Sequence, residues 1–393
     1  MKEEIVLAGA CRTAIGKFGG ALAATPAAEL GGIVVREALR RAGVSADAVD
    51  EVLLGCVLQA GLGQNVARQA ALDAGLPVET PAMTLNIVCG SGLQSVNTAA
   101  AMILAGQADV VVAGGMENMS ASPYVLDKAR FGYRMGDGAL VDTLINDALT
   151  DAFHKYHMGV TAENVAEQHG ITRRMQDEFA AVSQNKCEAA QNTGAFRDEI
   201  VPVPVKVKKE TVQFDRDEFP RPGVTVDSIS GLKPAFKKDG TVTAANASGI
   251  NDGAAAVVVM SRSKAEELGV RPQARWVAGA MAGVDPAFMG LGPVSATRKA
   301  LGRAGIDLTR IDLIEANEAF AAQSLAVGKL LEWDAEKVNV NGGALALGHP
   351  VGASGCRILV TLLHEMARRG CGYGLATLCV GGGMGVSCIV ERL

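Results

Sequence analysis

The first and last thirds of the sequence resemble each other, and this internal repeat limits the folds that the chain can adopt. The seventeen residues REALRRAGVSADAVDEV, from Arg36, align without gaps with RKALGRAGIDLTRIDLI, from Arg298, and seven positions are identical. Upstream, VLAGACRTAIGKFGG resembles WVAGAMAGVDPAFMG; downstream, ADVVVAGGMENMS from Ala108 resembles LATLCVGGGMGVS from Leu375. Three similar pairs in one order indicate two duplicated halves.

Each half alternates short apolar runs with runs of helical period. EIVLAGA, EVLLGCV and DVVVAGG are apolar and punctuated by glycine, as buried strands are. PAAELGGIVVREALRRAG has apolar residues at helical spacing and ends at Gly43. This alternation predicts βαβ units and a largely parallel sheet that is covered by helices.

The middle of the chain has a different composition. It is richer in charge, proline and aromatic residues, as in VPVPVKVKKE and FDRDEFPRPG, and it holds a clear helix that Thr172 caps and Gly194 ends. The strand-like GAAAVVVMS from Gly253 then resumes the first half. The predicted divisions are an N-terminal half (1–118 plus 249–270), an inserted loop domain (119–248) and a C-terminal half (271–393).

Charge and cysteine usage exclude several classes of protein. A formal net charge of −5 argues against a general nucleic-acid or membrane-surface binder. No uncharged apolar run reaches the roughly 18 residues of a membrane span, and MKEEIVLAGACRTAIG lacks the pattern of a signal peptide. The 8 cysteines form no C-x-x-C pair and no zinc-like cluster with histidine. We therefore expect a cytoplasmic protein with free thiols and no bound metal.

One cysteine stands directly before a predicted helix. NIVCGSGLQS, residues 86–95, places Cys89 between an apolar approach and a glycine-rich helix start. Unpaired N–H groups and the positive end of the helix dipole favour the thiolate there. Gly90 and Gly92 let a substrate approach the backbone closely. These residues alone fit either a nucleophile or a small buried core thiol.

Three further stretches carry candidate chemistry. His349, in NVNGGALALGHPVGASG, occupies the place in the second half that Cys89 occupies in the first, where it serves either as a base or as a structural hydrogen-bonding group. Cys379 precedes three glycines, whose N–H groups can converge on an oxyanion. Asn317 and Glu318, in EANEAFAAQS, are polar residues in an apolar stretch and are either structural or catalytic.

Taken together, these motifs resemble the thiolases, and in particular their short-chain acetyl-CoA C-acetyltransferase members. The motifs that carry the resemblance, in chain order, are NIVCGSGLQS, GGMENMS, YHMGVTAEN, NASGINDGAA, NEAFAAQS, NGGALALGHPVGASG and CVGGGMG. The resemblance implies an α/β fold in which the duplicated βαβ halves form a five-layered α/β/α/β/α body with an inserted loop domain. The layering is implied by the resemblance alone.

The resemblance also implies a chemistry, the reversible Claisen condensation of two acetyl-CoA molecules to acetoacetyl-CoA and coenzyme A. In it, Cys89 is the nucleophile, His349 its base, and Cys379 the acid or base at the methyl carbon. Asn317, acting through a water, and His349 stabilise the thioester enolate. The backbone N–H groups of Cys89 and Gly381 form a second oxyanion hole.

By the same resemblance, the inserted domain binds coenzyme A. The implied substrate- and coenzyme A-binding positions are Leu149, His157, Met158, Arg221, Ser228, Phe236, Ala244, Ser248, Met289 and Ala319. Among them, Met158 and Met289 wall the acyl pocket, and an apolar tunnel suits a long, thin ligand. One departure is Ala245, in TAANASG, where the family often has glycine. The lysines of KVKK and FKK are expected to form a solvated face.

The family also implies partners and assembly. Coenzyme A and acetyl-CoA are substrates and products, and no cofactor is tightly bound. The expected assembly is a homodimer that pairs into a homotetramer. The physiological direction of the reaction and the pathway that it serves are left open.

Three other classes compete with this interpretation. A ketosynthase of the same superfamily would pair its cysteine with two histidines, or with a histidine and an asparagine, whereas here Cys379 holds the position of the second base. A non-catalytic acyl-CoA-binding protein would have no need for all of the reactive residues. A redox protein would need a cysteine spacing that is absent here.

Overall fold

The structure, a computed structural model, describes residues 3–393, and most strands of this part join in one eleven-stranded sheet. Nine strands lie side by side in the order β13 (Leu313–Ala316), β14 (Tyr373–Val380), β15 (Met384–Arg392), β12 (Ala274–Gly283), β1 (Ile5–Thr13), β11 (Asn251–Ser261), β5 (Val110–Asn118), β3 (Glu51–Gly55) and β4 (Ala82–Leu85). Two short strands, β2 (Gly16–Lys17) and β8 (Ile200–Val201), pair with β11 and β1. The order is nearly symmetric about the β1–β12 pair, as expected for a duplication.

The sheet is mixed, so the prediction of a largely parallel sheet was wrong. β3 pairs in parallel with β4 and β5, and β13 with β14. β11, however, lies antiparallel between β1 and β5, and β15 lies antiparallel between β12 and β14. β15 follows β14 after the turn at residues 381–383, and so short a connection can only return the chain antiparallel.

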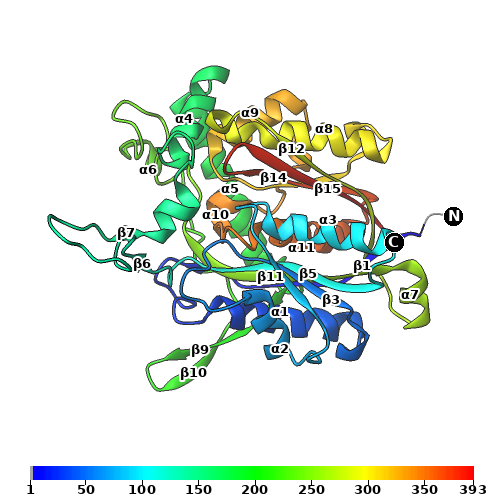
Figure 1. Ribbon diagram of the computed structural model, residues 1–393. Helices are drawn as coiled ribbons and strands as arrows, with labels where there is room; N and C mark the ends of the chain where they lie inside the picture. Colours follow the sequence, from blue (N-terminus) through cyan, green and yellow to red (C-terminus); the bar gives the residue numbers. More distant parts are fainter. Residues whose placement is uncertain (1–2) are drawn as a thin grey trace.

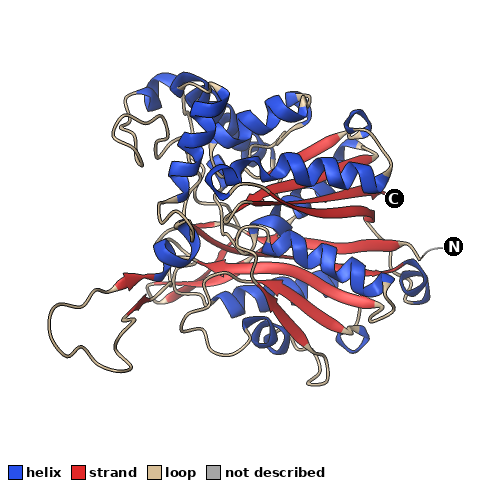
Figure 2. Cartoon of the chain, turned by 45° about the horizontal axis from the view of Figure 1, so that its top comes forward, coloured by secondary structure: helices blue, strands red, loops and turns tan. Residues whose placement is uncertain are grey.

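The helices complete five layers, which confirms the fold expected from the resemblance. They are α1 (Ala27–Ala42), α2 (Val66–Asp73), α3 (Ser91–Leu104), α4 (Met158–His169), α5 (Arg173–Thr193), α6 (Val226–Ser230), α7 (Arg262–Glu267), α8 (Gly292–Ala304), α9 (Ala321–Leu331), α10 (Ala344–Leu347) and α11 (Ser354–Arg369). In Figure 1, α3 and α11 lie between the strands of the two halves, with α1 and α2 outside one half and α8 outside the other. The two groups of strands and the central helices are also distinct in Figure 2.

Helix ends follow their sequence signals. α1 ends at Gly43 and α5 at Gly194, and both glycines adopt the left-handed conformation that suits a residue without a side chain. The Thr172 hydroxyl accepts a hydrogen bond from the N–H of Met175 at the start of α5. These boundaries are the predicted ones.

The central layer brings the two conspicuous motifs together. Cys89 precedes α3 and His349 precedes α11, and these two helices pack against each other in the shared core. The N-terminal ends of the two helices meet, because a Cβ at Gly92, in the first turn of α3, would lie 2.9 Å from the carbonyl oxygen of Gly352, just before α11. The fold therefore places two residues that are 260 positions apart in the chain at one site.

Between β5 and β11 the chain forms the inserted segment. It contains α4 to α6 and two separate hairpins, β6 (Tyr124–Val125) with β7 (Val141–Asp142) and β9 (Val203–Val207) with β10 (Glu210–Phe214). The division of the chain into three units stays a prediction. Among the helices of residues 3–393, none is long and apolar enough to cross a membrane.

Candidate active site

Three of the reactive residues proposed from the sequence line one cavity of about 250 Å³. Its walls consist of Cys89, Met119, Ala148, Leu149, His157, Met158, Phe236, Ala247, Ser248, Gly249, Ile250, Met289, Ala319, Phe320, His349, Val351, Cys379 and Gly381. A larger cavity of about 520 Å³ between α5 and α9 contains none of the three. Chemistry, rather than size, therefore identifies the candidate site.

Cys89 lies in a strained turn. The preceding residue, Val88, has φ of +52°, which is rare for a β-branched side chain. Ser91 stabilises this turn, because its hydroxyl donates to the Val88 carbonyl at 2.6 Å and accepts from the Ile87 N–H at 3.0 Å. The turn places the Cys89 thiol just outside the first residue of α3.

Burial raises the pKa of the Cys89 thiol to about 11, so the predicted thiolate at the helix start was wrong for the resting site. Desolvation raises this pKa by more than the backbone N–H donors near the sulfur lower it. Two N–H groups do act in the predicted direction, those of Gly381 and of Cys89 itself, and both lower the pKa. These are the two groups that the resemblance assigned to an oxyanion hole, and both lie close to the sulfur.

His349 is held as a neutral base. Its Nδ1 lies 2.5 Å from the Ser354 hydroxyl, which itself donates to the Pro350 carbonyl at 2.9 Å, and its main-chain N–H donates to Asn251 Oδ1 at 2.9 Å. A hydroxyl has one proton, so Ser354 accepts from Nδ1–H and leaves Nε2 unprotonated. Burial, aided by the charge of Arg357, lowers the pKa of His349 to about 3.

Cys379 and Asn317 complete the predicted catalytic set. Cys379 is buried near the end of β14, and burial, followed by the influence of Cys89, raises its pKa above the ordinary range of a thiol. Asn317 follows β13, and its Nδ2 lies 3.4 Å from both ring nitrogens of His349. Its Oδ1 is buried and has no hydrogen-bond partner among residues 3–393. Asn317 thus contacts His349 but does not line the cavity itself.

Glu318 occupies a structural position. Its carboxylate accepts from the Ser183 hydroxyl at 2.7 Å, from Asn339 Nδ2 at 2.8 Å and from the Leu345 N–H at 3.2 Å. It lies outside the cavity that contains the thiols. Of the two roles that the sequence left open, these contacts favour the structural one.

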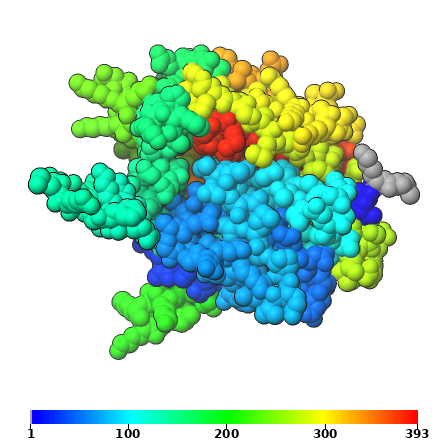
Figure 3. Space-filling view, viewed as in Figure 1, coloured from blue at the N-terminus to red at the C-terminus, as the bar shows by residue number. Residues whose placement is uncertain are grey.

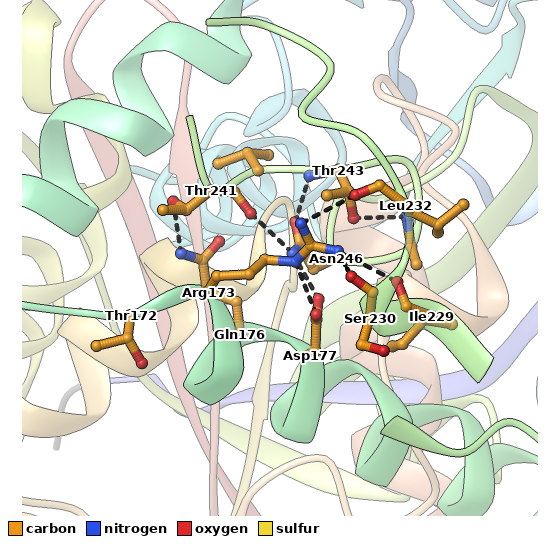
Figure 4. Close-up of polar contacts among 12 residues, drawn as sticks. Thr172, Arg173, Gln176, Asp177, Ile229, Ser230, Leu232, Thr241, Thr243 and Asn246 are labelled. Atoms are coloured by element: carbon orange, nitrogen blue, oxygen red, sulfur yellow. Dashed lines mark hydrogen bonds and ion pairs between the residues drawn. The ribbon is translucent and has the colours of Figure 1, made fainter. Parts of the chain in front are cut away.

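Polar contacts at the start of α5, shown in Figure 4, hold the segment that leads into one wall of the cavity. Asp177 accepts from Arg173 at 2.7 Å and from Asn246 at 2.9 Å, and Arg173 also donates to the carbonyls of residues 229, 230 and 232. The main chain then continues into the cavity wall, where the Ser248 N–H donates to the Ala319 carbonyl at 2.9 Å. The inserted segment is thus joined to the turn after β13.

The other predicted binding positions fall into two groups. Those that line the cavity are Leu149, His157, Met158, Phe236, Ser248, Met289 and Ala319. Within it, the His157 ring stacks on Phe236 with centroids 4.5 Å apart. Arg221, Ser228 and Ala244 are exposed and lie outside the cavity. The Ser228 hydroxyl already bonds to Thr225 in a helix cap. All of these assignments remain predictions.

Several cavity residues were not singled out from the sequence. They are Met119, Ala148, Ala247, Gly249, Ile250, Phe320 and Val351, with Ser354 behind His349. Val351 and Ser354 belong to GHPVGASG and Met119 to GGMENMS, so the motifs contained a signal, but the spacing does not show which side chains face inward. Within the part of the chain that is described, no three His, Cys, Asp or Glu side chains form a group that could hold a metal.

Comparisons with known proteins show which family the whole chain resembles. The chain matches the family description "Thiolase, N-terminal domain" over residues 5–263 and "Thiolase, C-terminal domain" over residues 270–392. The acetyl-CoA acetyltransferase of Cupriavidus necator is 63% identical over 390 residues (99% of each chain), and that of Pseudomonas aeruginosa is 61% identical over 391 residues (99% of this chain and 100% of the relative).

Solved structures are similarly close. The crystal structure of the Bacillus anthracis acetyl-CoA acetyltransferase aligns with a TM-score of 0.98 at 49% identity, covering 100% of this chain and 99% of the other. Human mitochondrial 3-ketoacyl-CoA thiolase aligns with a TM-score of 0.96 at 44% identity, covering 99% of both chains.

Proposed function

Because this chain belongs to the thiolase family, we propose that it is an acetyl-CoA C-acetyltransferase. It condenses two acetyl-CoA molecules to acetoacetyl-CoA and coenzyme A, and it catalyses the reverse thiolysis. One observation carries the proposal: Cys89, His349 and Cys379 line a single cavity, and the N–H groups of Cys89 and Gly381 lie close to the Cys89 sulfur.

The first half-reaction transfers an acetyl group to Cys89. In the resting site the thiol is protonated and His349 is neutral, so Nε2 accepts the thiol proton as the sulfur attacks the thioester carbonyl. The N–H groups of Cys89 and Gly381 stabilise the tetrahedral oxyanion. Coenzyme A leaves as a thiolate and takes the proton of Cys379, which leaves a Cys379 thiolate and a protonated His349.

The second half-reaction forms the carbon–carbon bond. The Cys379 thiolate removes a proton from the methyl group of the second acetyl-CoA, and its raised pKa makes it a strong base for this weak carbon acid. Protonated His349, and Asn317 acting through a water, stabilise the enolate oxygen. The carbanion then attacks acetyl-Cys89, and the Cys89 thiolate that leaves recovers its proton from His349. Every group returns to its starting state.

Coenzyme A and acetyl-CoA serve as product and substrate, and this chemistry needs no tightly bound cofactor, because two thiols, an imidazole and main-chain donors supply each step. The apolar stretch of the cavity, with Leu149, Phe236 and Ala319, suits the pantetheine arm. Arg221, outside the cavity, is proposed to meet the phosphates.

Assembly and location are proposed on separate observations. β4 is an open edge strand with Met83 exposed, and such edges favour pairing with another chain. The β6–β7 hairpin extends from the body in Figures 1 and 3 and exposes Phe131 and Met135. These two surfaces support a homodimer that pairs into a homotetramer. The free thiols support a cytoplasmic location.

A thiolysis assay tests the function. The purified protein, mixed with acetoacetyl-CoA and coenzyme A, should release two acetyl-CoA per turnover, and the Cys89→Ala variant should release none. A non-catalytic acyl-CoA-binding protein would bind acetoacetyl-CoA without consuming it. No turnover by the wild-type protein would exclude the proposed activity.

A further inference from the structure

A buried carboxylate outside the cavity links a segment that packs near Cys89 to the turn that follows His349. Glu117, at the end of β5, is fully buried. Its Oε2 accepts from the N–H groups of Val57 at 3.0 Å and Gly352 at 2.9 Å, and its Oε1 accepts from the Leu58 N–H at 3.1 Å. One side chain thus joins the segment after β3 to the turn between His349 and α11.

Both joined segments reach the site. Val57 and Leu58 pack in the same apolar cluster as Val351, and Cys89 packs against this cluster. Val351 also lines the cavity and adjoins Gly352, whose N–H Glu117 binds. The contacts of Glu117 therefore hold the apolar cluster against which Cys89 packs and the turn that follows His349.

The carbonyl of Gly352 is confined as closely as its N–H. A Cβ at Gly115, Gly55 or Gly92 would lie 2.1, 2.7 or 2.9 Å from this oxygen, closer than side-chain contacts allow. A Cβ at Gly352 would lie 2.6 Å from Glu117 Oε2. The Gly352 peptide is therefore tightly enclosed by glycines of the first half and by Glu117, and it has no room to shift.

We propose that Glu117 is a positioning residue, which fixes His349 against Cys89 by clamping the Gly352 turn of the second half onto the Val57–Leu58 segment of the first. The inference rests on the proposed function. A carboxylate suits this role because both its oxygens only accept, and three N–H donors face them. An amide in the same place would turn an NH₂ group toward one of these donors.

An apolar side chain in the place of Glu117 would leave three buried N–H groups without a partner. Burial raises the pKa of Glu117 to about 7 in spite of its three N–H partners, so the charged group is expensive to bury. What the carboxylate supplies that an apolar side chain cannot is a fixed distance between two main-chain segments of different halves.

The test separates acetylation of Cys89 from binding of coenzyme A. Full-length wild-type, Glu117→Gln and Glu117→Asp proteins are mixed with acetyl-CoA, and acetyl-Cys89 is followed in a single turnover by mass spectrometry. Glu117→Gln should acetylate about 100-fold more slowly while its Kd for coenzyme A changes less than about threefold, since small misplacements of reacting groups cost rate more than binding. Aspartate keeps the charge but is shorter, so the acetylation rate of Glu117→Asp should lie between those of the wild-type and Glu117→Gln proteins.

Asp312→Asn is the matched control. Asp312 also accepts two main-chain N–H groups, of Gly372 at 2.8 Å and Tyr373 at 2.9 Å, but it does so at the opposite end of β14 from Cys379. This variant should lose thermal stability and keep the wild-type acetylation rate. Equal slowing of Asp312→Asn and Glu117→Gln, in step with their melting temperatures, would overturn the proposal.

The remaining outcomes are also decisive. Wild-type acetylation rates in folded Glu117→Gln would remove this inference and leave the proposed function intact. Failure of the wild-type protein to form acetyl-Cys89 would instead remove the proposed function, and this inference with it. If Glu117→Gln does not fold, Glu117→Asp decides: slowed acetylation with normal coenzyme A binding supports the clamp, and a wild-type rate overturns it.

Discussion

His349 Nδ1 lies 2.5 Å from the hydroxyl of Ser354, five residues further along the chain. The Ser354 hydroxyl donates its proton to the Pro350 carbonyl, so it can only accept a hydrogen bond from His349. The bond between Ser354 and Nδ1 therefore determines which ring nitrogen of His349 carries a proton. The arrangement leaves Nε2 free to accept a proton, and it depends on a single hydroxyl.

Replacing Ser354 by alanine should therefore slow acetylation of Cys89 by about tenfold, since the ring can then turn or change tautomer. Coenzyme A binding should stay unchanged. Ser387→Ala is the control, because Ser387 is also buried and hydrogen-bonded, to Thr377 and Thr297, but lies outside the cavity. Equal acetylation rates in the two variants would contradict a role in orienting His349.

The two cysteines should stop the reaction at different points. Cys379→Ala keeps the nucleophile and its base, so it should accept an acetyl group, an adduct of about 42 Da, but should not condense it. Cys89→Ala should form no adduct. Mass spectrometry of the intact proteins after exposure to acetyl-CoA reads both results. Condensation by Cys379→Ala near the wild-type rate would mean that the roles are assigned wrongly.

Alkylation should report the raised pKa of Cys89. With a pKa of about 11, the thiol is protonated over the neutral range, so its reaction with iodoacetamide should rise by about tenfold per pH unit from pH 7 to 9 without a plateau. His349, with a pKa lowered to about 3, stays neutral throughout and should add no inflection. Site-resolved peptide mapping measures the rate. A plateau near pH 7 would indicate a preformed thiolate instead.

Met158 and Met289 line the cavity and should limit the length of the acyl chain. The wild-type protein should prefer acetoacetyl-CoA, and each methylene that does not fit should cost about 1–3 kcal/mol. Met158→Ala should shift the kcat/KM ratio toward 3-ketohexanoyl-CoA by about tenfold. Met260→Ala, which removes a methionine buried in β11 outside the cavity, should leave that ratio unchanged. Efficient thiolysis of 3-ketohexadecanoyl-CoA by the wild type would contradict the limit.

The β6–β7 hairpin should govern tetramer formation. Phe131 is 89% exposed and Met135 is 98% exposed, which is unfavourable unless another chain covers them. Substituting both by serine should convert a tetramer to a dimer in light scattering and leave thiolysis largely intact. Val212→Ser, at an exposed apolar position of the β9–β10 hairpin, serves as control. A tetramer that survives the double substitution would exclude this surface.

Local features of the fold were readable from the sequence because local forces determine them. Gly43 and Gly194 end helices through the backbone conformation that glycine adopts with least strain, and Thr172 starts one through a hydrogen bond three residues away. The duplication predicted two equivalent strand-to-helix turns, and the motifs pointed to Cys89, His349 and Cys379. Apart from the duplication, each of these signals lies within a few residues of the feature that it determines.

Other features depended on which distant segments pack together. The antiparallel place of β11 follows from how the chain returns after the inserted segment, and no residue of GAAAVVVMS specifies a partner strand. The helix start before α3 favours a thiolate, yet partial burial by residues from both halves raises the pKa of the Cys89 thiol. Glu117 and Gly352 meet across 235 positions of sequence. The sequence alone determined the elements and the reactive groups; burial and long-range contacts, which arise only on folding, decided their protonation states and their relative positions.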